Sequence, residues 1–136
     1  MRRIVRALCV GTLLGALGLS GCVPGAAPEP SSPLVGIGKP VRSPSGTFTA
    51  VIEKVQDSNG SYLIPTIQTS AGAAAFTDQK YSARHRLLVM WQAKDDVLWV
   101  YSGDVGTSRL EQVGGTWTKT QTTQNMPAEV REEFGR

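Results

Sequence analysis

The sequence predicts a mainly β fold, a small antiparallel meander arranged as a sheet, sandwich or open barrel of about seven strands, with a short C-terminal helix. Three observations predict it. The chain has 136 residues, which is the length of one domain. After residue 45 it consists of short runs in which apolar and polar side chains alternate. Turn-forming residues separate these runs, and the connections are short enough for antiparallel pairing.

The expected strands cover residues 46–55, 62–69, 73–77, 86–93, 97–102, 108–113 and 116–120. The runs at 86–93 and 97–102 are apolar on both faces, which favours central positions in the sheet. Pro65 lacks an amide donor, so we expect an edge or a bulge at that position.

A helix is predicted for residues 125–134. Asn125 is a suitable N-cap and Pro127 suits the first turn. Val130 and Phe134 are four residues apart, so they can dock together on the sheet.

The N-terminus has the pattern of a secretory signal. Arg2, Arg3 and Arg6 precede an apolar run over residues 7–19. A membrane-spanning helix needs about 20 apolar residues, so this run is too short to span a bilayer. Basic residues followed by such a run are typical of signal peptides.

The apolar run ends in Leu19-Ser20-Gly21-Cys22. This motif resembles the lipobox of bacterial lipoproteins. The resemblance implies that residues 1–21 are removed and that the Cys22 sulfur carries a diacylglyceryl group such as one bearing palmitate. It also implies a lipid-anchored protein of the cell envelope. Lipoproteins with Asp after the cysteine are commonly retained in the inner membrane. Because Val23 stands at that position here, the resemblance favours the outer membrane, with the protein facing the periplasm. The alternative is an ordinary signal peptide with a coincidental cysteine.

Cleavage changes the charge and the thiol content. The three leader arginines account for the whole net charge of +3, so the mature chain is neutral on balance. A nucleic-acid partner is therefore not expected. Cys9 leaves with the leader and Cys22 is lipidated, so no thiol remains for a disulfide or a Cys-ligated metal. We expect no cofactor other than the covalent lipid, and no metal.

Three parts of the chain are predicted: a signal peptide (1–21), a lipidated cysteine with a Pro-rich tether (22–45) and one β-rich domain (46–136). The tether could reach roughly 70 Å if extended. Residues 34–37 are apolar enough to dock on the domain as an edge segment. Most of the eight prolines lie in the tether: Pro24, Pro28, Pro30, Pro33, Pro40 and Pro44.

Catalytic patterns are weak. His85 is the sole histidine, between Arg84 and Arg86. A Ser–His–Asp triad using Asp78 or Asp104 is formally available, but no Gly-x-Ser-x-Gly motif accompanies it. Asp95-Asp96 is interpreted as a turn. We therefore expect no enzyme, with a hydrolase at His85 and Asp104 as the least favoured alternative.

The expected function is protein binding. Contact surfaces are enriched in Tyr, Trp and Arg, and the Gly-containing segment 102–109 is a candidate recognition loop. The predicted contact residues are Tyr81, Arg84, His85, Arg86, Asp104 and Arg109. The sequence thus predicts a membrane-anchored envelope lipoprotein with a protein partner in the envelope, such as an inhibitor or an immunity protein against an envelope-acting toxin. The alternative is a structural or assembly lipoprotein of a larger envelope complex.

Overall fold

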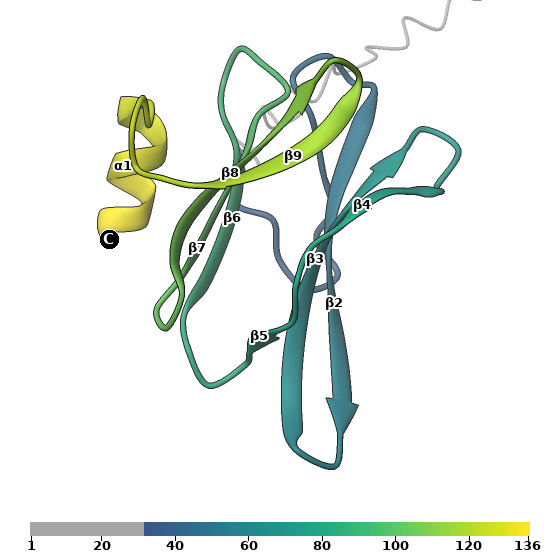
Figure 1. Ribbon diagram of the computed structural model, residues 1–136, viewed down its shortest axis with the longest axis vertical. Helices are drawn as coiled ribbons and strands as arrows, with labels where there is room; N and C mark the ends of the chain where they lie inside the picture. Colours follow the sequence, from purple (N-terminus) through teal and green to yellow (C-terminus); the bar gives the residue numbers. More distant parts are fainter. Residues whose placement is uncertain (1–31) are drawn as a thin grey trace, which may run out of the picture.

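The computed structural model describes residues 32–136, so the predicted leader, the lipobox and Cys22 lie outside the described residues. The described chain forms strands β1 to β9 and then helix α1, Ala128–Gly135 (Figure 1). The strands are β1 (Val41–Arg42), β2 (Phe48–Asp57), β3 (Gly60–Thr69), β4 (Ala74–Thr77), β5 (Tyr81–Ser82), β6 (Leu87–Trp91), β7 (Leu98–Ser102), β8 (Gly106–Val113) and β9 (Thr116–Gln121).

The strands form two antiparallel sheets, which confirms the mainly β prediction. The first sheet has the order β1-β2-β3-β4, and β5 also pairs with β3. The second has the order β6-β7-β8-β9, so each strand pairs with the next along the chain. The seven predicted strands all form, with shifted ends. β1 and β5 were not predicted, because two residues are too few to show an alternating pattern.

The main core lies between the sheets. One side comes from β2 and β3 and the other from β6, β7 and β8, so the molecule is a sandwich. Burying these apolar side chains is the main favourable contribution to folding. The buried residues of this core on the strands are Ala50, Ile52, Ile67, Tyr81, Val89, Trp91, Leu98, Val100 and Leu110.

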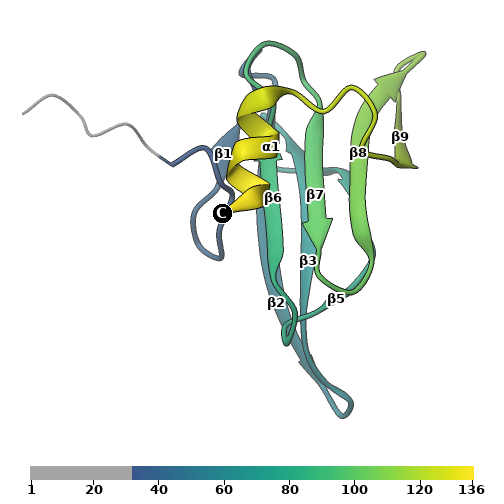
Figure 2. The ribbon, with the colours of Figure 1, turned by 90° about the vertical axis from the view of Figure 1, so that its left-hand side faces the viewer.

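A second core lies on the outer face of the second sheet, where α1 covers β6 and β7 (Figure 2). Val130 of α1 packs with Trp99 of β7, and the Phe134 ring lies 6.0 Å from the Tyr101 ring. The predicted docking of the helix is therefore confirmed. The predicted cap is wrong: Asn125 has a left-handed φ of 58°, and the residue before the helix is Pro127, with no side-chain cap.

β6 and β7 are apolar on both faces, but for different reasons. β7 is central, as predicted, whereas β6 is the first strand of its sheet. β6 is nevertheless covered on both faces, by the first sheet on one side and by α1 on the other. Coverage of the faces therefore explains its composition, and a central position is not required.

Residues 34–43, which we call the N-terminal strap, cross from one sheet to the other. The Val35 amide donates to the Val89 carbonyl at 2.8 Å, next to a bridge between Leu34 and Met90. Farther along, Ile37 bridges β2 and β1 pairs with it. Val35 is buried in the main core. The predicted boundary at residue 46 is thus too late, because the strap is part of the folded domain; the predicted docking of residues 34–37 is confirmed.

The β2–β3 hairpin extends beyond the rest of the sandwich (Figure 1). Its strands pair from Phe48 opposite Thr69 to Asp57 opposite Gly60. Pro65 is buried and lies inside β3, not at a sheet edge. Its missing donor is tolerated because the partner strand on that side is interrupted between β4 and β5.

Within residues 32–136, no helix has the length and apolar character needed to cross a membrane.

Candidate functional site

Three connections lie at the end of the molecule toward which the β2–β3 hairpin points (Figures 1 and 2). They are the segment between β5 and β6, the turn between β7 and β8, and the hairpin tip, which projects beyond the other two. The predicted loop 102–109 is shorter than expected, because β8 already begins at Gly106. The remaining turn carries Asp104, which is exposed.

Four of the six predicted contact residues come together here. Arg84, His85 and Arg86 are consecutive exposed residues between β5 and β6. The β7–β8 turn lies beside them, because the Gly103 amide donates to the Arg86 carbonyl at 3.0 Å. Asp104 accepts a hydrogen bond from the Ser102 hydroxyl. This bond lowers the pKa of Asp104 below its ordinary value, and the nearby charge of His85 contributes in the same direction.

Tyr81 was expected at the surface, and this prediction is wrong. The side chain is only 1% exposed, because β5 directs it between the sheets. Its hydroxyl donates to Asp78 Oδ2 at 2.8 Å and accepts from Lys119 Nζ at 2.7 Å. Burial raises the pKa of the Tyr81 hydroxyl far above its ordinary value, and the charge of Asp78 raises it further. Tyr81 therefore serves the core.

Arg109 does not lie with the other predicted contact residues. In the β7–β8 register it lies opposite Trp99, whose ring packs in the α1 core. Arg109 therefore lies on the α1 side of the sheet. Its guanidinium is half-buried and pairs with Glu111 at 2.7 Å.

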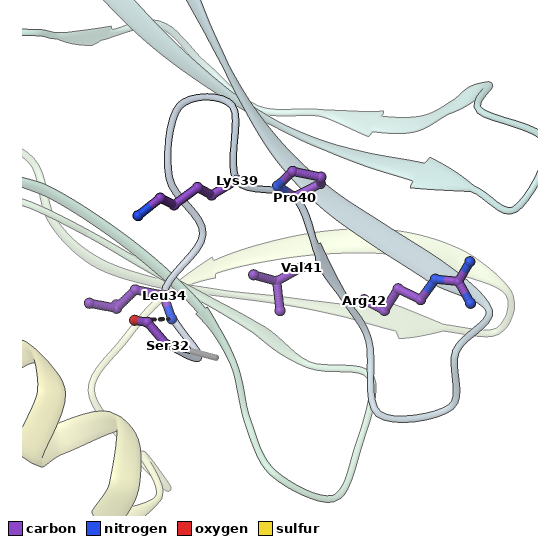
Figure 3. A pocket seen from close by; sticks show the side chains of 6 residues that line it. All are labelled: Ser32, Leu34, Lys39, Pro40, Val41 and Arg42. Carbon is purple, nitrogen blue, oxygen red and sulfur yellow. Dashed lines mark hydrogen bonds between the residues drawn. The ribbon is translucent and has the colours of Figure 1, made fainter. Parts of the chain in front are cut away.

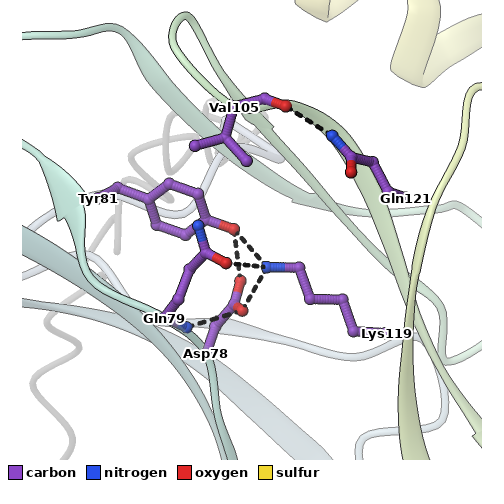
Figure 4. Close-up of polar contacts among 6 residues, drawn as sticks. All are labelled: Asp78, Gln79, Tyr81, Val105, Lys119 and Gln121. Atoms are coloured by element: carbon purple, nitrogen blue, oxygen red, sulfur yellow. Dashed lines mark hydrogen bonds and ion pairs between the residues drawn. The ribbon is translucent and has the colours of Figure 1, made fainter.

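Asp78, Tyr81 and Lys119 form a polar cluster between β9 and the segment that joins β4 to β5 (Figure 4). Lys119 Nζ lies 2.6 Å from Asp78 Oδ1 and 3.3 Å from Gln79 Oε1. The ammonium group has three donors and three partners, so its hydrogen bonds are satisfied within the protein. This arrangement indicates a structural role: the cluster joins β9 of the second sheet to the β4–β5 segment of the first sheet.

A polar pocket of about 420 Å³ lies against the hairpin. On β2, Lys54 and Gln56 continue the inward-facing series of Ala50 and Ile52, with period two. On the other side of the pocket, the Ala83 amide donates to the Ser61 carbonyl at 3.0 Å and holds the turn against β3. The lining residues are Lys54, Gln56, Gly60, Ser61, Ala83 and Arg84.

Of these residues, only Arg84 was predicted from the sequence as a contact residue. A signal for the others was present: the inward-facing positions of β2 change from apolar to polar after Ile52. That change marks the point beyond which no apolar layer covers the hairpin. The pairing of Gln56 with Ser61 then follows from the register of the hairpin.

A second hollow, of about 500 Å³, lies along the N-terminal strap (Figure 3). It carries two exposed cationic side chains, those of Lys39 and Arg42. The lining residues are Ser32, Leu34, Lys39, Pro40, Val41 and Arg42.

Asp95 and Asp96 lie in the connection between β6 and β7, as predicted. Asp95 accepts a local bond from the Gln92 side chain. Asp96 instead accepts bonds from the amide and hydroxyl of Ser45, which is distant in the chain. Across the described residues, no group of three His, Cys, Asp or Glu side chains could hold a metal ion.

Comparisons of the chain with protein-family models, with curated proteins and with solved structures found no match.

Proposed function

We propose that this chain is a membrane-anchored lipoprotein of the bacterial envelope whose β sandwich binds another protein. The proposal rests on one observation: three exposed connections and a pocket lie together at one end of the molecule. Arg84, His85 and Arg86 are exposed at this end. Arginine is enriched at binding hot spots. An inhibitor or an immunity protein would use such a surface.

The lipid anchor is proposed on the lipobox resemblance, with Cys22 as the attachment point. The ten peptide steps from Cys22 to Ser32 can span at most about 35 Å. This is half of the roughly 70 Å expected for a tether that extends to residue 45. The described chain begins beside β1, well away from the hairpin tip (Figure 2). In this proposal the sandwich stays close to the bilayer, and the hairpin end is left free for the partner.

The hydrolase alternative has little support from the geometry. His85 is exposed on a turn, whereas a general base usually works in a cleft that excludes water. The carboxylate of Asp104 already accepts the Ser102 hydroxyl.

Site-specific photocrosslinking in producing cells tests the binding proposal. A photoreactive residue at position 84 or 86 of the full chain should give a discrete protein adduct. Position 94, in the exposed turn at the opposite end of the sandwich, is the matched control. An absence of adducts at 84 and 86, or equal adducts at 94, would argue against a partner at this end.

Radiolabelled palmitate tests the anchor. Label should enter the parent chain and Cys9→Ala, but not Cys22→Ala. Label retained in Cys22→Ala would refute lipidation at this residue.

A structural role in an envelope assembly is the second candidate, and β9 favours it. β9 is the last strand of its sheet, so one side of its backbone has no partner strand within the described residues. Such edges can pair with another chain. Val113, beside the β8–β9 turn, is 60% exposed. Light scattering separates the two candidates: edge pairing predicts oligomers that Thr118→Lys, which places a charge on the exposed edge, disrupts, whereas a binding module is monomeric without its partner.

A further inference from the structure

We propose that the pocket between the β2–β3 hairpin and the turn at Ala83-Arg84 receives a carboxylate side chain from an acidic segment of the partner protein. This inference rests on the proposed function and names the chemistry of its partner. Two features of the pocket support it: the balance of charge and the balance of hydrogen-bond donors.

The charge of the pocket is positive. Lys54 and Arg84 are its only charged lining residues, and neither forms an ion pair among residues 32–136. The nearest acid on the hairpin, Asp57, lies on the opposite face by strand alternation and pairs with Lys80 at 3.6 Å. The two cations therefore have no compensating acid in the pocket, and an anion placed between them would reduce their mutual repulsion.

Donors also outnumber acceptors at the pocket. The Ser61 hydroxyl donates to Gln56 Oε1, which leaves the Gln56 amide nitrogen with two N–H donors. Lys54 and Arg84 supply donors only. A ligand that only accepts hydrogen bonds matches this set, and an ionised carboxylate is such a ligand. The planar guanidinium of Arg84 suits a carboxylate that accepts two parallel bonds.

The position of the pocket favours a protein carboxylate over a lipid phosphate. The pocket lies at the hairpin end, whereas the chain leads toward the proposed anchor from beside β1. The volume of about 420 Å³ suits one or two side chains of a partner. Arg86 and His85 are exposed next to it along the chain and would extend the contact to neighbouring acidic residues.

Fluorescence polarisation with the lipidated full chain in neutral detergent tests the inference. The probe is a labelled peptide of alternating Glu and Gly. We expect saturable binding that weakens with salt and that falls about tenfold or more in Lys54→Gln and in Arg84→Gln. The matched control is Arg42→Gln, which removes an exposed arginine outside the pocket and should bind like the parent. Circular dichroism should show the same thermal midpoint for all these variants, because each side chain is exposed.

Three results would overturn the inference. They are no binding of the peptide, an equal loss in Arg42→Gln, or competition by inorganic phosphate as strong as that by free peptide. Binding of phosphatidylglycerol vesicles that depends on Arg84 would instead assign the pocket to a membrane surface. If the parent chain fails to bind the peptide while the photocrosslink at position 86 forms in both the parent and Lys54→Gln, the carboxylate assignment is wrong and the protein-binding proposal stands.

Discussion

Removing Lys119 should destabilise the fold more than removing Asp78, although the two side chains form one ion pair of 2.6 Å. Their burial is unequal: the side chain of Asp78 is 2% exposed and that of Lys119 is 23% exposed. Lys119→Met leaves the Asp78 carboxylate confined between the sheets. Its remaining donors are the Tyr81 hydroxyl and the backbone amide of Gln79. Asp78→Asn leaves an ammonium group that can turn toward water.

The magnitude follows from this difference. Breaking a buried pair by removing one partner costs about 3–5 kcal/mol. The partial exposure of Lys119 places Lys119→Met at the low end, about 3 kcal/mol. Asp78→Asn should cost about 1–2 kcal/mol, because the amide keeps some of the hydrogen bonds. The double variant should cost clearly less than the sum of the two, since the second change removes a group that the first left unpaired.

Urea unfolding followed by tryptophan fluorescence measures these differences as changes in the free energy of unfolding. Equal costs for the two single variants, or additivity in the double variant, would refute the reasoning from unequal burial. Val130→Ala, a change in the α1 core on the other face of the second sheet, is a suitable control, because its cost should add to that of Lys119→Met.

Three further outcomes are expected. Because the folded state holds the Tyr81 hydroxyl protonated above its unfolded pKa of 10.0, the contribution of this group to stability should be constant below pH 10 and fall by about 1.4 kcal/mol per pH unit above it. Tyr81→Phe should lose this fall in urea titrations, and an unchanged fall would contradict the assignment. Ser102→Ala should raise the pKa of Asp104 in a carboxyl NMR titration, and no shift would show that the hydroxyl is not its main cause. A chain starting at residue 46 should be about 2–4 kcal/mol less stable in urea unfolding than a chain starting at residue 33, because it lacks the strap; equal stability would exclude the strap from the core.

Local patterns predicted the fold well where a strand was long enough to show its period. The alternation in β2 and the two-sided apolar runs of β6 and β7 belong to single segments, so the chain itself displays them. The strap carries no such period. Its burial depends on Val35 meeting Val89, which is distant in sequence and is brought near only by the second sheet.

The candidate site shows the same division. The exposed turn at residues 84–86 was predictable, because consecutive polar residues beside a short strand are typical of surface turns. Tyr81 was mistaken for a surface residue because the partners that bury its hydroxyl, Asp78 and Lys119, come from different segments. The part of the pocket formed by Lys54 required the register of the hairpin and the closeness of Ala83 to Ser61.

The strap has a mechanical consequence. If the lipid at Cys22 holds the chain, any tension between the bilayer and a bound partner enters the sandwich through Leu34 and Val35. The load meets the edge of β6 first, and then Ile37 and β1 carry it to β2 in the other sheet. Stretching should therefore peel off the strap as a first step, lengthening the chain by about 30 Å, before the β2–β3 hairpin bears any force. Detachment of the strap would therefore absorb the extension, and the hairpin end of the sandwich would stay folded under moderate tension.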